Sequence, residues 1–307
     1  MPAPAPKIRP TLLTLTLGAA AAWLLAPALH ARAPVRAETK AAFAIALDAT
    51  SNPITDLTKD DWGVREDGQN RKLIDAKPAT DPLTIVVLVD MTRWVQSSLK
   101  DMRTALTTFT HAIQAAQPTA QIAIVGFSTQ SQTLVELGKT AADIDKAIAH
   151  VVADQSGQST VMLEAFMDAA KKLAQAPSPR RAIVTLNLDG FDETSSVQPQ
   201  NVASAVLATR ASLWAVSFKN SESARVKGQG GQSRDQVLNN LTSQTGGVRL
   251  TVGTSNVLEP QLQKVAQVLL AQYLVTYERP EGPAPKLLQM AVARPGAQML
   301  VPKVPPQ

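Results

Sequence analysis

The chain has 307 residues, of which 45% are hydrophobic and 18% charged, and this composition is that of a folding chain rather than a disordered one. The absence of cysteine excludes disulfides, thiolate zinc sites and a cysteine nucleophile, and three histidines leave little scope for histidine chemistry. Residues 1–37 contribute four of the five net positive charges, and the remainder has 26 basic and 25 acidic residues. Charge therefore gives no reason to expect nucleic acid or an anionic membrane as a partner.

Residues 1–37 have the organisation of a secretory signal peptide. Lys7 and Arg9 precede an apolar run over residues 11–29, and small residues follow it. We expect cleavage after Ala37 and hence export. The alternative is an uncleaved membrane anchor, because the apolar run approaches the ~20 residues that a membrane span needs.

Residues 38–80 have the pattern of a small β unit. Apolar residues alternate at period two from Phe43 to Leu47 and again at Trp62 and Val64, and Asp67-Gly68 supplies a hairpin turn. The unit is too small for a core of its own, so we expect it to pack against the rest of the chain.

Residues 81–278 alternate between apolar runs of strand length and segments of helical periodicity. The continuous run from Leu83 to Val89 is typical of a strand that is buried on both faces of a parallel sheet. The alternation predicts an α/β domain with a doubly wound, mostly parallel, Rossmann-like sheet and helices on both faces. The predicted strands are 83–89, 122–127, 134–137, 182–188, 213–218 and 248–252, and the predicted helices are 99–113, 144–148, 162–173, 202–208, 237–241 and 258–269.

Residues 279–307 are predicted to form a C-terminal β extension and a proline-rich tail. Its last residues, 301–307, we expect to be frayed.

Polar side chains lie in three loops at one edge of the predicted sheet. Two of these loops follow a strand, and the third precedes a helix. The loops are 90–94, 157–160 and 189–192, and they contain carboxylates and hydroxyls. In doubly wound sheets ligands bind outside the carboxyl ends of the strands. Hard oxygen ligands suit Mg²⁺, Mn²⁺ or Ca²⁺ rather than zinc.

Three further segments give the chain a resemblance to a known family. They are residues 54–68 (ITDLTKDDWGVREDG), residues 241–247 (LTSQTGG) and residues 273–277 (YLVTY). With the three loops, they resemble bacterial exported proteins in which a short β segment precedes a von Willebrand factor type A domain. The resemblance covers roughly residues 40–295, and it implies adhesion or complex assembly.

In this family a metal-ion-dependent adhesion site uses D-x-S-x-S on the first loop, a Thr on the second and an Asp on the third. The resemblance assigns these positions to Asp90, Thr92, Thr160 and Asp189. Trp94 stands where the second Ser should be, and an indole offers only an N–H donor and much bulk. We therefore expect a degenerate site in which Mg²⁺, Mn²⁺ or Ca²⁺ binds weakly or not at all. The repulsion between two carboxylates without an ion argues mildly for binding.

Simpler roles exist for the same residues. Asp90 and Thr160 could cap the helices that follow them, and Ser159 could replace Thr160 as the family's Thr. Trp94 could be an exposed protein-contact anchor, a plug over the site or ordinary packing. Asp192 and Glu193 we expect in a solvated loop. The candidate partner contacts on these loops are Arg93, Trp94 and Asp192.

The first functional hypothesis is an exported, periplasmic or extracellular, non-enzymatic module for protein interaction or adhesion. Its partner would be a protein, with an acidic side chain that could complete an ion's coordination, while membrane contact would occur only through an uncleaved leader. One alternative is a Mg²⁺-dependent hydrolase or phosphoryl-transfer enzyme that uses Asp90 and Asp189. Another is a structural envelope-assembly protein with a vestigial site. The sequence has no G-x-S-x-G or H-E-x-x-H motif, and this favours binding over catalysis.

Overall fold

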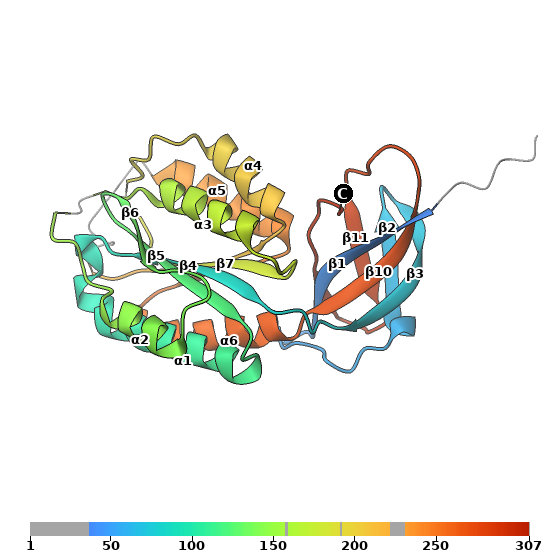
Figure 1. Ribbon diagram of the computed structural model, residues 1–307, viewed down its shortest axis with the longest axis horizontal. Coiled ribbons are helices and arrows are strands. Elements are labelled where there is room, and N and C mark those ends of the chain that lie inside the picture. Colours follow the sequence, from blue (N-terminus) through green and yellow to red (C-terminus); the bar gives the residue numbers. More distant parts are fainter. Residues whose placement is uncertain (1–36, 157–158, 191, 222–230, 307) are drawn as a thin grey trace, which may run out of the picture. The chain divides into compact units, whose positions relative to one another are not determined.

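The computed structural model describes residues 37–156, 159–190, 192–221 and 231–306 (Figure 1). The predicted leader lies outside these residues, apart from Ala37. The described residues contain a mostly parallel six-stranded sheet with helices and an antiparallel six-stranded sheet. The predicted α/β fold, with a β unit before it, is confirmed.

No helix in the described part of the chain is long and apolar enough to cross a membrane.

The mostly parallel sheet has the strand order β6-β5-β4-β7-β8-β9. All of its pairs are parallel except β5 with β6, which form a hairpin at one edge. Strand β4, near the centre of this sheet, is entirely buried, which explains why the sequence shows a continuous apolar run there. The strands are β4 (Thr84–Asp90), β5 (Gln121–Phe127), β6 (Ser131–Val135), β7 (Arg181–Leu188), β8 (Ser212–Phe218) and β9 (Arg249–Val252).

Helices cover both faces of this sheet. The side chains of β4 alternate between two hydrophobic cores: Ile85, Val87 and Val89 belong to one, and Val86 and Leu88 to the other. The first core contains α1, α2 and α6 and the second α3, α4 and α5, as the two helical layers in Figure 1 show. The helices are α1 (Leu99–Ala116), α2 (Ala141–Ala149), α3 (Met162–Gln175), α4 (Pro199–Thr209), α5 (Gly231–Thr245) and α6 (Leu258–Leu270).

The antiparallel sheet combines both ends of the described chain, in the order β11-β2-β3-β10-β1-β12. Asp67 and Gly68, with φ of 47° and 77°, form the tight turn between β2 and β3 that their sequence predicts. Trp62 is buried in this sheet's core, and Trp214 is buried in the core of the other sheet. The strands are β1 (Ala37–Leu47), β2 (Trp62–Glu66), β3 (Gln69–Pro78), β10 (Tyr273–Pro280), β11 (Leu288–Val292) and β12 (Gln298–Leu300).

Two details differ from the sequence-based expectation. The closing strand at 273–277 was assigned with the α/β domain, whereas β10 lies in the antiparallel sheet and pairs with β1 from Ala37↔Pro280 to Ala44↔Tyr273. The end of the chain is not frayed, because the Lys303 N–H donates to the Gln244 carbonyl (2.8 Å), and Pro305 and Pro306 are buried.

Two glycines explain the family-like TGG segment after α5. Gly246 has φ of +74°, and a Cβ on it would lie 2.6 Å from the Val301 carbonyl carbon. A Cβ on Gly247 would lie 1.7 Å from the Leu213 carbonyl oxygen. Only glycine therefore lets the chain pass between β8 and the C-terminal segment.

A buried ion-pair network joins β2, β3 and β10. The Glu66 carboxylate is fully buried and accepts hydrogen bonds from the Arg279 Nε (3.0 Å), the Tyr277 hydroxyl (2.6 Å) and the Arg71 Nε (2.9 Å). Burial raises the pKa of Glu66, but these hydrogen bonds outweigh burial and hold the pKa below its ordinary value. Burial and the adjacent Glu66 both raise the pKa of Tyr277. The strand from the C-terminal part is thus fixed to the N-terminal hairpin by charge as well as by backbone pairing.

We predict that Glu66→Gln lowers the free energy of unfolding by about 3–5 kcal/mol at pH 7, because two arginines lose their buried counter-charge. Denaturant unfolding measures this. Because the folded-state pKa of Glu66 is depressed, its contribution is present above the unfolded pKa and is lost as pH falls below it, so the two proteins should converge in acid.

The matched control is Glu278→Gln on β10, next to Arg279, which removes an exposed pair with Lys72 (2.9 Å) and should cost at most about 1 kcal/mol. Equal effects of the two substitutions would contradict the proposed role of the Glu66 network.

Candidate interaction site

The parallel sheet brings two of the predicted site carboxylates to one edge. Asp90 is the last residue of β4, and Asp189 follows β7, the parallel neighbour of β4. The Leu188 N–H donates to Asp90 Oδ2 (3.0 Å), which ties the first loop to the third. The predicted convergence of these loops therefore follows from strand order.

Asp90 is engaged by the protein itself. The residue is 1% exposed, and its Oδ1 accepts hydrogen bonds from the Thr92 N–H (2.9 Å) and hydroxyl (2.8 Å). Burial raises the pKa of Asp90, and the hydrogen bonds and the charge of Arg234 offset only part of this effect. Asp90 thus fixes the turn that follows β4.

Thr160 joins the second loop to the third. Its N–H donates to the Asp192 carbonyl (3.0 Å), and the Thr194 N–H donates to the Thr160 carbonyl (2.8 Å). Its hydroxyl accepts from the Met162 N–H (3.1 Å) at the start of α3. Thr160 thus binds the first N–H of α3 from the position before the N-cap, which is Val161.

Asp189 lies among cations that the sequence analysis did not connect with the site. Its carboxylate is 3.7 Å from the Lys219 Nζ and 3.9 Å from the Arg249 guanidinium, which also pairs with Asp235 at 2.6 Å. The Asp189 side chain is 21% exposed. Lys219 directly follows β8 and Arg249 begins β9, so only the strand order brings them to Asp189.

Trp94 is half-buried in the 3₁₀ turn Arg93–Ser98. Its side chain packs against the hydrophobic core of α1, α2 and α6, and the Arg93 guanidinium lies 4.4 Å from the ring centroid. The Asn220 side-chain amide donates to the Trp94 carbonyl (2.8 Å). Of the three interpretations of Trp94, packing is the one that this geometry favours. Asp192, the third candidate contact, is exposed.

Two glutamates at this edge were missed by the sequence analysis. Glu193 is not in a solvated loop: its Oε1 accepts from the Leu163 N–H (3.4 Å) and the Ser195 hydroxyl, and burial raises its pKa. Glu164 accepts from the Ser196 N–H (2.8 Å). In each glutamate the Oε2 atom is buried and has no hydrogen-bond partner in the described structure.

Arg234 was missed as well, because it lies in a polar helix segment with no motif. It is 1% exposed in the first turns of α5, and all three guanidinium nitrogens are buried without a hydrogen-bond partner among the described residues. Its charge acts on both Asp90 and Glu193 and offsets part of the rise in pKa that burial causes in each.

The donor set at this edge fits a divalent cation poorly. Asp90, Thr92, Thr160 and Asp189 supply oxygens of the right kind, but the carboxylates already interact with Arg234, Lys219 and Arg249. An added cation would meet charges of its own sign. Within the described ranges, no group of three or more acidic or histidine side chains is arranged to hold a metal ion.

Asp154 lies outside the three loops and holds the first of them in place by a hydrogen bond. Its N–H donates to the Met91 carbonyl (2.7 Å), and its carboxylate accepts from the hydroxyls of Ser156 (2.6 Å) and Ser128 (2.8 Å). These hydrogen bonds, led by that of Ser156, lower the pKa of Asp154 to about 2.

A doubly wound sheet with polar loops at its carboxyl edge defines an α/β ligand-binding domain, and comparison with known proteins gives its family. The chain belongs to the von Willebrand factor type A domain family, whose model matches residues 84–278. The resemblance seen in the sequence is thereby confirmed. No curated protein matches the sequence.

Several solved structures are similar in fold. A von Willebrand factor type A protein from Catenulispora acidiphila is 11% identical, with a TM-score of 0.48, over 87% of this chain and 74% of that one. The domain of the type V pili tip protein Mfa5 from Porphyromonas gingivalis is 10% identical, with a TM-score of 0.44, over 62% and 95%. Proximal thread matrix protein 1 from the mussel byssus is 20% identical, with a TM-score of 0.46, over 62% of this chain, which spans only 48% of that protein.

We predict that Asp154→Asn lowers the melting temperature at neutral pH, by less than the Glu66 substitution does, because Asp154 is only partly buried whereas Glu66 is fully buried. The folded-state pKa is depressed, so the stabilisation is present above the ordinary value of 3.8 and is lost as pH falls toward 2. Thermal unfolding of parent and variant between pH 2 and 7 measures this.

Asp60→Asn, which alters an exposed carboxylate in the other sheet's periphery, serves as the control. A difference between parent and Asp154→Asn that stays constant down to pH 2 would contradict the prediction.

Proposed function

We propose that this protein is an exported, non-enzymatic interaction module that binds a protein partner through the loops at the carboxyl edge of its parallel sheet, without a divalent ion. Domains of this family are generally protein-interaction modules. The observation that carries the metal-free form is that Asp90 and Asp189 are already engaged by the protein's own donors and cations. The resemblance and the leader support a periplasmic or extracellular location.

The same observation argues against the enzymatic alternative. A general base or an ion-held nucleophile needs a carboxylate that can reach substrate, whereas Asp90 is buried and accepts three hydrogen bonds. A direct assay is hydrolysis of p-nitrophenyl phosphate in Mg²⁺, for which we expect no turnover above that of Asp90→Asn.

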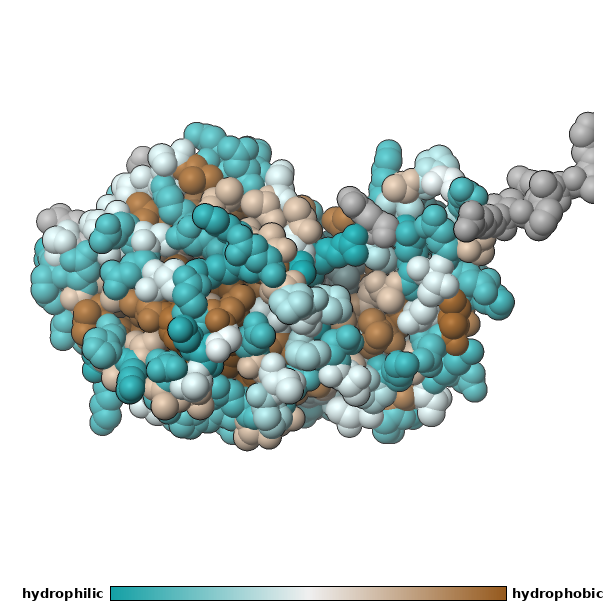
Figure 2. Space-filling model, in the orientation of Figure 1, coloured by the Kyte–Doolittle hydropathy of each residue, from teal (hydrophilic) through white to brown (hydrophobic). Residues whose placement is uncertain are grey.

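The proposed binding face is polar and of mixed charge. Lys219 has a 57% exposed side chain, Asp192 is exposed, and Val152 is 50% exposed next to the first loop. Among the described residues the only other exposed large apolar side chains are Leu287 and Val304. The side of the molecule drawn in Figure 2 is mostly hydrophilic, with apolar residues between the hydrophilic ones. An acidic side chain of the partner would thus pair with Lys219 rather than with a metal, and binding would weaken with salt.

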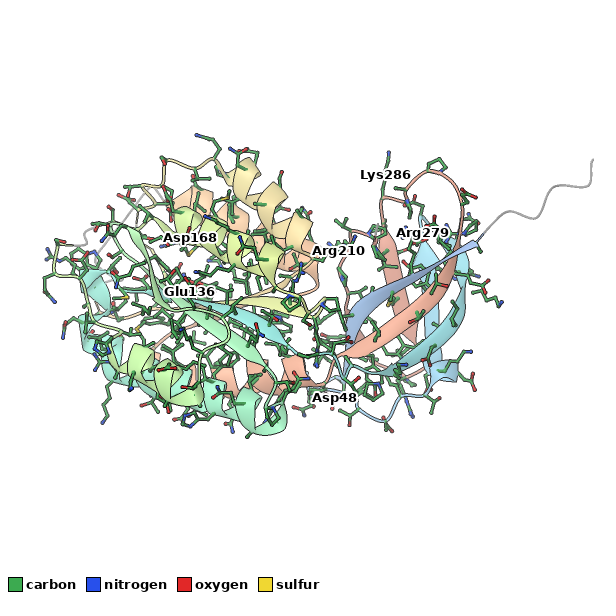
Figure 3. The ribbon with its side chains drawn as sticks, in the orientation of Figure 1. Asp48, Glu136, Asp168, Arg210, Arg279 and Lys286 are labelled. Atoms are coloured by element: carbon green, nitrogen blue, oxygen red, sulfur yellow. The ribbon has the colours of Figure 1, made fainter. Side chains whose placement is uncertain are left out.

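We predict that a photoreactive amino acid at Val152 crosslinks a discrete partner in the envelope of the producing cell, because this position is exposed at the binding face. The matched position is Arg210, at the C-terminal end of α4 and hence at the opposite edge of the sheet (Figure 3). Gel analysis and mass spectrometry identify the product.

Excess unmodified protein should compete for the crosslink, and Lys219→Glu should compete at least tenfold less well, which corresponds to one charge-assisted contact of about 1.4 kcal/mol. A product formed equally from both positions, or none from Val152, would favour the structural envelope role with a vestigial site.

We also predict that the exported protein begins at Glu38. Cleavage after Ala37 removes the leader and leaves Glu38 to Ala44 of β1 paired with β10, and Ile45 to Leu47 paired with β12. N-terminal sequencing of the protein from the cell envelope tests this. Retention of residues 1–37 in a membrane fraction would instead identify the leader as an anchor.

A further inference from the structure

We infer that Arg234 is the resident cation of the site and takes the place of the divalent ion that the family resemblance implies, so that the loops keep their arrangement without metal. This inference deepens the proposed metal-free contact and rests on it for its functional meaning. Its evidence is the burial, position and surroundings of one side chain.

The position of Arg234 is unfavourable for a positive charge unless anions compensate it. It lies in the first turns of α5, where the helix dipole is positive, and only 1% of the residue is exposed. A buried guanidinium without a counter-charge is costly. Its presence therefore points to nearby anions that need it.

Those anions are the carboxylates of the candidate site. The charge of Arg234 acts on Asp90 from the first loop and on Glu193 from the third, and Glu164 interacts with Glu193 at the start of α3. Glu193 and Glu164 each present a buried oxygen without a direct partner, as Arg234 presents three nitrogens. Buried water commonly bridges such donors and acceptors.

The charge of Arg234, on α5, thus acts on the first loop through Asp90 and on the third loop through Glu193. A divalent ion at the family's position would do the same work from the same edge, but it would be repelled by the guanidinium already there. Removal of Arg234 leaves the carboxylates without that charge and opens the site to an ion. The site should therefore hold either the Arg234 guanidinium or a metal ion, but not both.

The test compares the exported protein with Arg234→Met, which keeps the bulk and removes the charge, and with Arg234→Lys, which restores a charge. The control is Arg210→Met, an exposed arginine outside the site. Melting temperatures are measured in EDTA and in millimolar Mg²⁺ or Mn²⁺, because a native-state ligand raises the melting temperature by mass action.

We expect the parent and Arg210→Met to melt at the same temperature in EDTA and in metal. Arg234→Met should melt several degrees lower in EDTA and recover in Mn²⁺, and Arg234→Lys should regain most of the loss without metal. If Arg234→Met does not fold in EDTA, folding that depends on Mn²⁺ is the same positive result.

Three results would overturn the inference. They are a metal-dependent rise in the parent that Asp189→Ala abolishes, an Arg234→Met protein as stable as the parent in EDTA, and an Arg234→Met protein that Mn²⁺ does not stabilise. None of these readouts involves a partner, so they are independent of the crosslinking result that tests the binding role.

Discussion

Strand β10 occupies the centre of the antiparallel sheet, and much of the architecture depends on its pairing with β1 and β3. Backbone groups at the centre of a sheet need partners on both sides, so the N-terminal segment cannot complete its sheet with its own residues. The Glu66–Arg279 contact adds a buried charge pair to the same junction. The α/β domain is consequently an insertion between the two halves of one sheet, and residues 38–80 and 273–300 form a single structural unit.

At the candidate site, the protein's own side chains balance the negative charge of the carboxylates. The resemblance assigns an ion to Asp90 and Asp189, but hydrogen bonds satisfy Asp90 and lysine and arginine side chains accompany Asp189. The charge of the buried Arg234 acts on Asp90 and Glu193. In the proposed function, the loops present these charges to a partner directly. The sequence resemblance suggested where a site lies, while the individual side chains decide whether an ion fits there.

The fold was predictable because its signals are local. The run before Asp90, the helical spacing of α1 and the Asp67-Gly68 turn each follow from a few neighbouring residues. The loops of the site followed from strand order alone. The pairing of β10 was not predictable, because its register depends on partners in β1 and β3, far away in the sequence. Arg234 and Glu193 also escaped, since a charged residue in a polar segment gives no sign that the tertiary structure buries it.

The central place of β10 has a consequence for how the chain reaches its folded state. A ribosome or an export channel releases this chain from its N-terminus, and β1 emerges among the first residues of the structure. Its partner strand emerges only when nearly the whole chain has appeared. Until then β1 and β3 have unpaired edges, which are prone to pair with other chains. Strands β1 and β3 therefore stay unpaired at these edges until β10 has emerged. Chaperone protection during synthesis or transport consequently matters more for this protein than for a domain built from consecutive strands.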